Sequence, residues 1–215
     1  MRYKTIIFDL DGTLLNTLDD LAAATNYALA QHQLPQRTKE EVRWFVGNGI
    51  RKLIERAVPA KTPPDVQEAV YATFNTYYKA HCNDATKAYY GVMELLNMLR
   101  SAGCKTAIVS NKADYGVQEL AKQYFSGALD AACGERAGIA KKPAPDMLLA
   151  IMRQLKAEPA STIYIGDSDT DLDTARNAGV DCIGACWGFR GRAFLEAHGA
   201  KLLAENVGDI WELIK

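Results

Sequence analysis

The fold of this 215-residue chain is decided by the stretch Thr5-Ile6-Ile7-Phe8-Asp9-Leu10-Asp11-Gly12-Thr13-Leu14. Its first four residues are apolar or β-branched, which predicts a buried strand of a parallel sheet. Because side chains two apart in a strand point to the same side, Asp9 and Asp11 should project together. Gly12 then allows the backbone to turn sharply after the C-terminal end of the strand.

Two carboxylates placed this close together repel one another unless a cation or a shared proton intervenes. The pair Asp9 and Asp11 therefore indicates a metal site, a nucleophile with a neighbouring acid, or both. Taken alone, the same motif is also compatible with a hairpin turn that carries solvated acids. The rest of the chain has to decide between these interpretations.

The composition is that of an ordinary globular protein, with 48% hydrophobic and 24% charged residues. The net charge of −1 gives no electrostatic reason to expect binding to nucleic acid or to an anionic membrane. No apolar stretch approaches the roughly 18 residues of a membrane helix, and no signal-peptide pattern is visible. None of the five cysteines forms a C-x-x-C pair, which favours reduced thiols. We expect a cytoplasmic protein, with monomer and homodimer both open.

Residues 16–85 are predicted to be helical almost throughout. The pattern gives four helices, interrupted at Pro35, at Gly47-Asn48-Gly49 and at Pro63-Pro64. Thr17 or Asn16 can cap the first helix. Thr38, with Glu41 three residues later, predicts a capping box for the second.

From about residue 86 onward, strands alternate with helices, which predicts a parallel sheet with helices on both faces. The expected architecture is an α/β, Rossmann-like, three-layer core formed by residues 1–15 and 86–215. The all-helical segment 16–85 is inserted after the first strand as a second, smaller domain.

Polar clusters fall at the predicted ends of several strands, where open parallel sheets bind their ligands. Asp9 and Asp11 follow the first strand, Ser110-Asn111-Lys112 follows strand 105–109, and Gly166 to Asp171 follows strand 162–165. Lys142 lies in a loop before a helix. Each cluster alone could be a helix cap or a solvated surface group, but their joint position at one sheet edge predicts a functional site.

These motifs resemble the four catalytic motifs of the haloacid dehalogenase-like superfamily. Asp9 to Leu14 matches the first motif, Ser110-Asn111 the second, Lys142 the third, and Gly166-Asp167-Ser168-Asp169-Thr170-Asp171 the GDxxxD form of the fourth. The inserted helices resemble the small α-helical cap of that superfamily, so the resemblance covers nearly the whole chain.

The resemblance implies a phosphoryl-transfer mechanism in which Mg²⁺ masks the negative charge of the phosphate. Asp9 would be the nucleophile and form an aspartyl-phosphate. Asp11 would protonate the leaving oxygen and later deprotonate the attacking water. Mg²⁺ would be held by the Asp9 side chain, the Asp11 carbonyl and Asp167, while Asp171 would support the metal or Lys142 from behind.

The same resemblance implies a phosphate-binding set that consists of Thr13, Ser110, Asn111 and Lys142. Haloalkanoate dehalogenases of the superfamily lack a carboxylate at the position of Asp11 and need no metal. The presence of Asp11 therefore favours phosphoryl transfer over cleavage of a carbon–halogen bond.

Substrate selectivity is expected to come from the helical segment. Between Arg37 and Lys61 there are seven basic and three acidic residues, which could be a solvated helix face. The loop Gly47, Asn48, Gly49 with Arg51 could also receive a second anionic group at a helix start. This loop resembles the cap of phosphoglycolate phosphatases, as do Gly91-Val92 and Trp187-Gly188-Phe189.

The implied substrate is a small phosphorylated metabolite such as 2-phosphoglycolate. The chain departs from that subfamily at Asn16, where Asp is more common, and at Tyr90, where Pro is frequent. A β-phosphoglucomutase-like sugar-phosphate isomerase, a pyrophosphatase and a sugar-phosphate phosphatase of similar build stay open as alternatives.

Overall fold

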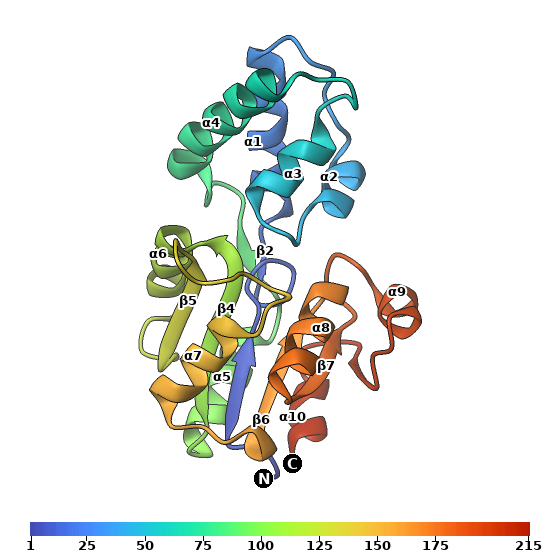
Figure 1. Ribbon diagram of the computed structural model, residues 1–215. Coiled ribbons are helices and arrows are strands. Elements are labelled where there is room, and N and C mark those ends of the chain that lie inside the picture. The colour runs from blue at the N-terminus through green and yellow to red at the C-terminus, as the bar shows by residue number, and fades with distance from the viewer. The chain divides into compact units, whose positions relative to one another are not determined.

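The computed structural model describes residues 1–215 and contains a parallel sheet of six strands in the order β5-β4-β1-β6-β7-β8. The strands are β1 (Thr5–Phe8), β4 (Lys105–Ala113), β5 (Ala131–Glu135), β6 (Thr162–Gly166), β7 (Asp181–Ala185) and β8 (Leu202–Ala204). β1 runs through the middle of the sheet between β4 and β6 (Figure 1). The predicted α/β class with a parallel sheet is confirmed.

Helices cover both faces of this sheet. They are α5 (Val92–Ser101), α6 (Asp114–Phe125), α7 (Asp146–Leu155), α8 (Asp169–Ala178), α9 (Arg192–Ala197) and α10 (Asp209–Ile214), with a short 3₁₀ turn at Pro159–Ser161. Ile6 and Phe8 pack into one apolar cluster with residues of α5, α6 and α10, whereas Ile7 joins the opposite cluster with residues of α7 and α8. Alternate residues of β1 thus serve opposite layers, as the period of a strand requires.

The chain divides into two compact units, Met1–Leu15 with Ala88–Lys215, and Asn16–Lys87. The second unit, called here the helical cap, contains α1 (Leu18–Gln31), α2 (Lys39–Phe45), α3 (Ile50–Ala57) and α4 (Pro64–His81). In α4 the buried residues Val70, Phe74 and Tyr78 recur every four positions and form its apolar face. No helix of the chain is both long and apolar enough to cross a bilayer.

A short two-stranded ribbon, β2 (Leu15–Asn16) with β3 (Lys87–Ala88), lies where the chain passes between the units. These strands are not predictable from the sequence, because two residues are too few to show an alternating pattern. The sequence also ended the strand of β4 at Val109. In the structure β4 continues through Ser110-Asn111-Lys112, and its register with β5 shifts between Val109 and Ala113.

The hydrogen bonds at the starts of α2 and α1 show whether the predicted capping residues act as caps. The backbone N–H of Glu41 donates to Thr38 Oγ1 at 3.1 Å, and that of Thr38 donates to Glu41 Oε2 at 2.7 Å. The predicted capping box is therefore confirmed. At α1, Asn16 Oδ1 accepts from the Leu18 N–H at 3.3 Å, whereas the Thr17 side chain makes no capping bond.

A buried carboxylate joins the two ends of the cap. Asp20 in α1 accepts hydrogen bonds from the Ala85 N–H at 2.8 Å, the Thr86 N–H at 2.9 Å and the Thr86 hydroxyl at 2.6 Å. Asp20→Ala removes the acceptor of three hydrogen bonds, so we expect the free energy of unfolding to fall by about 2–4 kcal/mol.

Urea unfolding followed by circular dichroism measures this loss. The matched control is Asp19→Ala, since Asp19 is exposed and forms a surface ion pair with Lys39. That substitution should cost less than about 1 kcal/mol. Equal losses for the two variants would show that Asp20 does not hold the ends of the cap together.

Candidate active site

Three carboxylates from separate segments of the chain meet in the α/β unit. Asp9 directly follows β1, Asp167 directly follows β6, and Asp171 lies in the first turn of α8. All three are buried, and one oxygen from each lies within 4.8 Å of the others. β1 and β6 are adjacent and parallel, so their carboxyl ends deliver these groups to the same edge of the sheet.

The Lys142 ammonium lies inside this cluster. Its Nζ is 2.9 Å from Asp9 Oδ1, 2.6 Å from Asp171 Oδ1 and 3.0 Å from the Tyr164 hydroxyl. Burial alone would lower the pKa of Lys142, but the charges of Asp171 and Asp9 outweigh it and raise that pKa. Lys142 therefore stays protonated and supplies one positive charge to the cluster.

One ammonium does not balance three carboxylates. Burial raises the pKa of Asp9 to about 7, with Asp171 and Asp11 adding to the rise and Lys142 opposing it. Burial, Asp171 and Asp9 also raise the pKa of Asp167 well above its usual range. Asp9 Oδ1 is buried and is ion-paired with Lys142. An all-oxygen centre with excess negative charge fits a hard divalent cation such as Mg²⁺.

Backbone groups that pack closely against Asp167 fix its position. The Phe189 N–H donates to Asp167 Oδ2 at 2.6 Å. A Cβ on Gly12 would lie 2.3 Å from Asp167 Oδ2, and one on Gly188 would lie 2.2 Å from Asp167 Cβ. Gly12 also has φ +86°, which favours glycine. Gly188 and Phe189 were noted in the sequence only for their family resemblance, and their contact with Asp167 was missed.

Both oxygens of Asp171 are already occupied within the protein. Oδ1 accepts from Lys142, and Oδ2 accepts from the Ser168 N–H at 3.1 Å and the Ser168 hydroxyl at 2.6 Å. Of its two expected roles, this geometry favours support of Lys142 over support of a metal. Tyr164, which alternation in the sequence marks only as a core residue, contributes its hydroxyl to the same network and donates to the Val109 carbonyl at 2.8 Å.

The four predicted phosphate-binding residues differ in how far their side chains are already hydrogen-bonded within the protein. The Thr13 hydroxyl is buried and has no hydrogen-bond partner. Ser110 Oγ accepts from the Lys112 N–H at 3.3 Å. Asn111 makes two bonds to the backbone of Lys142, accepting from its N–H at 2.8 Å and donating to its carbonyl at 3.0 Å. The side chain of Asn111 therefore holds the Lys142 loop in place.

Asp11 faces a second buried lysine, Lys112, which belongs to the predicted polar cluster Ser110-Asn111-Lys112 but had no predicted role. Lys112 Nζ lies 3.2 Å from Asp11 Oδ1, and the two side chains are 3% and 14% exposed. A lysine that follows Ser-Asn in a sequence looks like a surface residue, and no local pattern signals its burial.

Two candidate residues of the cap, Asn48 and Arg51, pair with other residues of the cap. Arg51 pairs with Glu68 at 2.5 Å and lies over the Tyr71 ring at 4.2 Å. Arg56 holds the loop before α3 by donating to Asn48 Oδ1 at 2.7 Å.

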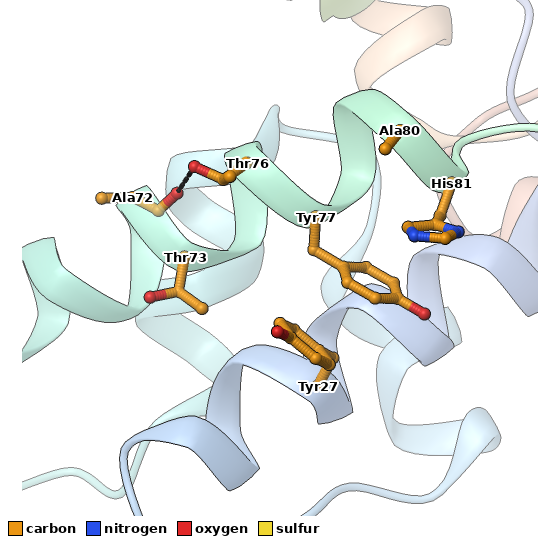
Figure 2. Close-up of a pocket in the computed structure, with 7 residues that line it drawn as sticks. All are labelled: Tyr27, Ala72, Thr73, Thr76, Tyr77, Ala80 and His81. Carbon is orange, nitrogen blue, oxygen red and sulfur yellow. Dashed lines mark hydrogen bonds between the residues drawn. The ribbon is translucent and has the colours of Figure 1, made fainter.

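In that loop Gly47 and Gly49 have φ of 119° and 84°, which explains the two glycines. The cap also has a groove of about 420 Å³ along α1 and α4 (Figure 2). The rings of Tyr27 and Tyr77 stack there at 4.1 Å, and that of His81 stacks on Tyr77 at 4.2 Å. None of the predicted site residues lines this groove.

The chain is similar to several known proteins. A family model described as haloacid dehalogenase-like hydrolase matches residues 6–185. The phosphoglycolate phosphatase of Pseudomonas putida is 32% identical over 210 residues, which cover 95% of this chain and 77% of the relative. That of Haemophilus influenzae is 35% identical over 201 residues, which cover 87% and 88% of the two chains.

A solved structure from Lactobacillus delbrueckii subsp. bulgaricus, of a protein provisionally named phosphoglycolate phosphatase, is 36% identical. Its TM-score to this chain is 0.94, and the superposition covers 100% of this chain and 99% of that one.

Proposed function

Because the chain belongs to the haloacid dehalogenase-like hydrolase family, we propose that it hydrolyses phosphomonoesters with Mg²⁺ through an aspartyl-phosphate on Asp9. Its membership in this family, together with the names of its relatives, identifies the chain as a phosphatase. The observation that carries the finer proposal is the buried centre itself. There a buried oxygen of Asp9 lies 2.9 Å from Lys142 Nζ, and three carboxylates outnumber the one ammonium among them.

The proposed metal ligands are the side chains of Asp9 and Asp167 and the backbone carbonyl of Asp11. When bound, Mg²⁺ would offset the charge of these carboxylates and of the phosphoryl oxygens. The closely spaced carboxylate oxygens of Asp9 and Asp167 support their part of this assignment, as does the charge left over after Lys142 is counted. The part of the Asp11 carbonyl rests on the family resemblance.

In the proposed reaction Asp9 attacks phosphorus, and the bond between phosphorus and the ester oxygen breaks. Asp11 gives its proton to the departing oxygen. It then takes a proton from the water that attacks phosphorus and releases Asp9 and inorganic phosphate. Lys142 and the hydroxyls of Thr13 and Ser110 would hold the phosphoryl oxygens as charge develops. The buried, unpartnered Thr13 hydroxyl supports this role, because a bound phosphoryl oxygen would satisfy it.

The proposed substrate is 2-phosphoglycolate, which is supported by the names of the relatives in P. putida and H. influenzae. We assign selectivity to the helical cap and, within it, to the loop Gly47, Asn48 and Gly49 with Arg51. Arg51 already pairs with Glu68 in this structure, so it would have to exchange that partner to contact a substrate carboxylate.

Metal removal and a substrate panel test the proposal together. Chelation by EDTA should lower turnover by about 10²-fold or more, because a bound Mg²⁺ would stabilise the charge of the transition state by several kcal/mol. Added Mg²⁺ should restore turnover. In a colorimetric phosphate-release assay, kcat/KM for 2-phosphoglycolate should exceed that for glucose phosphates and pyrophosphate by about tenfold or more.

Full turnover in EDTA would refute the metal-dependent mechanism. Mg²⁺-dependent hydrolysis of p-nitrophenyl phosphate without hydrolysis of 2-phosphoglycolate would refute only the substrate.

A further inference from the structure

Lys112 is a buried lysine that the proposed reaction does not yet use. We propose that it positions the Asp11 carboxylate for proton transfer to the leaving group, an inference that rests on the proposed phosphatase function. The observation that carries it is the ion pair between Lys112 Nζ and Asp11 Oδ1, 3.2 Å long, between two side chains that are both largely buried.

The topology of the sheet creates this pair. β1 and β4 are adjacent and parallel, and Phe8 is level with Ile108. Asp11 lies three residues beyond Phe8, and Lys112 lies four residues beyond Ile108. Both residues therefore lie at the same edge of the sheet, where the carboxyl ends of the strands meet. The pair therefore ties the turn after β1 to the end of β4.

Two glycines pack close to Lys112, one beside its side chain and one against its backbone. A Cβ on Gly116, in the first turns of α6, would lie 3.4 Å from Lys112 Cε and 3.8 Å from its Cγ and Cδ. A Cβ on Gly134 in β5 would lie 2.6 Å from the Lys112 carbonyl oxygen. Lys112 is thus enclosed along its stem and its backbone, and it cannot sample the many rotamers of a surface lysine.

A general acid works only when its proton is aimed at the oxygen that departs. Asp11 lies near the negatively charged cluster of Asp9, Asp167 and Asp171, which would repel its carboxylate. Lys112 Nζ donates to Asp11 Oδ1 both when Asp11 is charged and when its other oxygen, Oδ2, carries the proton, so it fixes the direction of the group in both states. Lys112 itself exchanges no proton: the proton moves from Asp11 to the ester oxygen as the bond to phosphorus breaks. A misplacement of about 1 Å can cost such a step about 10²-fold.

The test is the dependence of the Lys112→Met defect on the leaving group. The value of kcat/KM includes only the steps up to formation of the aspartyl-phosphate. With 2-phosphoglycolate or ethyl phosphate, whose alkoxide needs a proton, we expect a loss of about 30- to 100-fold. With 2,4-dinitrophenyl phosphate, whose phenolate leaves unprotonated, we expect a loss below about threefold.

A double-mutant cycle sharpens the result. Asp11→Asn should show the same dependence on the leaving group, and Asp11→Asn with Lys112→Met should be no worse than Asp11→Asn alone. The control is Lys122→Met, an exposed lysine on α6, which should match the wild type. Lys112→Gln, which can still donate a hydrogen bond to Asp11, should retain more activity toward the alkyl ester than Lys112→Met.

Equal losses with both kinds of ester would overturn the proposal, because they would indicate contact with the phosphoryl group or a purely structural role. Additive losses in the cycle would do the same, as would failure of both Lys112 variants to fold. If the wild type hydrolyses neither ester, the proposed function itself fails, and that result is distinct from all of these.

Discussion

Replacing Asp9 by asparagine is expected to lower kcat by about 10⁴-fold or more while the melting temperature stays the same or rises. An amide oxygen is a poor nucleophile toward phosphorus, so the proposed aspartyl-phosphate cannot form. Asparagine has nearly the same shape as aspartate and removes one of the three crowded negative charges. The prediction therefore separates the role of Asp9 in chemistry from any role in stability.

Phosphate release and differential scanning calorimetry, carried out on the same preparation, measure the two effects. Asp173→Asn is the matched control, because Asp173 lies on α8, is about half exposed and pairs with Arg176. It should leave both quantities close to those of the wild type. Turnover of Asp9→Asn within tenfold of the wild type would contradict the assignment of Asp9 as nucleophile.

Lys142→Met is expected to have the largest effect on stability. It removes the only ammonium in direct contact with both Asp9 and Asp171 and leaves these buried carboxylates without a positive charge beside them. Breaking a buried ion pair on one side typically costs about 3–5 kcal/mol, which is about 10 °C in melting temperature for a chain of this size. Activity should be lost as well, because Lys142 is proposed to hold the phosphoryl oxygens.

The neighbouring lysine provides the control. Lys141 is about one third exposed and pairs with Glu135 at 3.5 Å, so Lys141→Met should change stability by less than about 1 kcal/mol. Adding Asp171→Asn to Lys142→Met should recover part of the lost stability, since it removes one of the unpaired charges. If Lys142→Met is as mild as Lys141→Met, the buried cluster is not the electrostatic centre described here.

The parts of the fold that local pattern determines were predictable. The run Thr5–Phe8 matches β1, and the Thr38 capping box opens α2. Two features were not predictable: the ribbon of β2 and β3, and the continuation of β4 past Val109. Two-residue strands carry no periodicity, and the polar end of β4 is held by its neighbours in the sheet rather than by its own sequence.

The same distinction applies to the site. The sequence selected Asp9, Lys142 and Asp167, and the structure brings them together; their catalytic roles stay predictions. Lys112 was placed in a polar cluster without a role, and Tyr164 was not selected at all, because the importance of both depends on tertiary neighbours. Lys112 is buried only because the folded chain places Asp11 and Gly116 around it, and Tyr164 looks like any aromatic residue of a core strand.

The central claim is a covalent bond between Asp9 and the phosphoryl group. The most direct measurement is to mix enzyme, Mg²⁺ and substrate, quench with acid within milliseconds, and locate the phosphoryl group by mass spectrometry of peptides. The account predicts a phosphorylated peptide that contains Asp9, present in the wild type and absent from Asp9→Asn. Rapid phosphate release with no phosphorylated peptide at any quench time, or with the phosphoryl group on another residue, would contradict it.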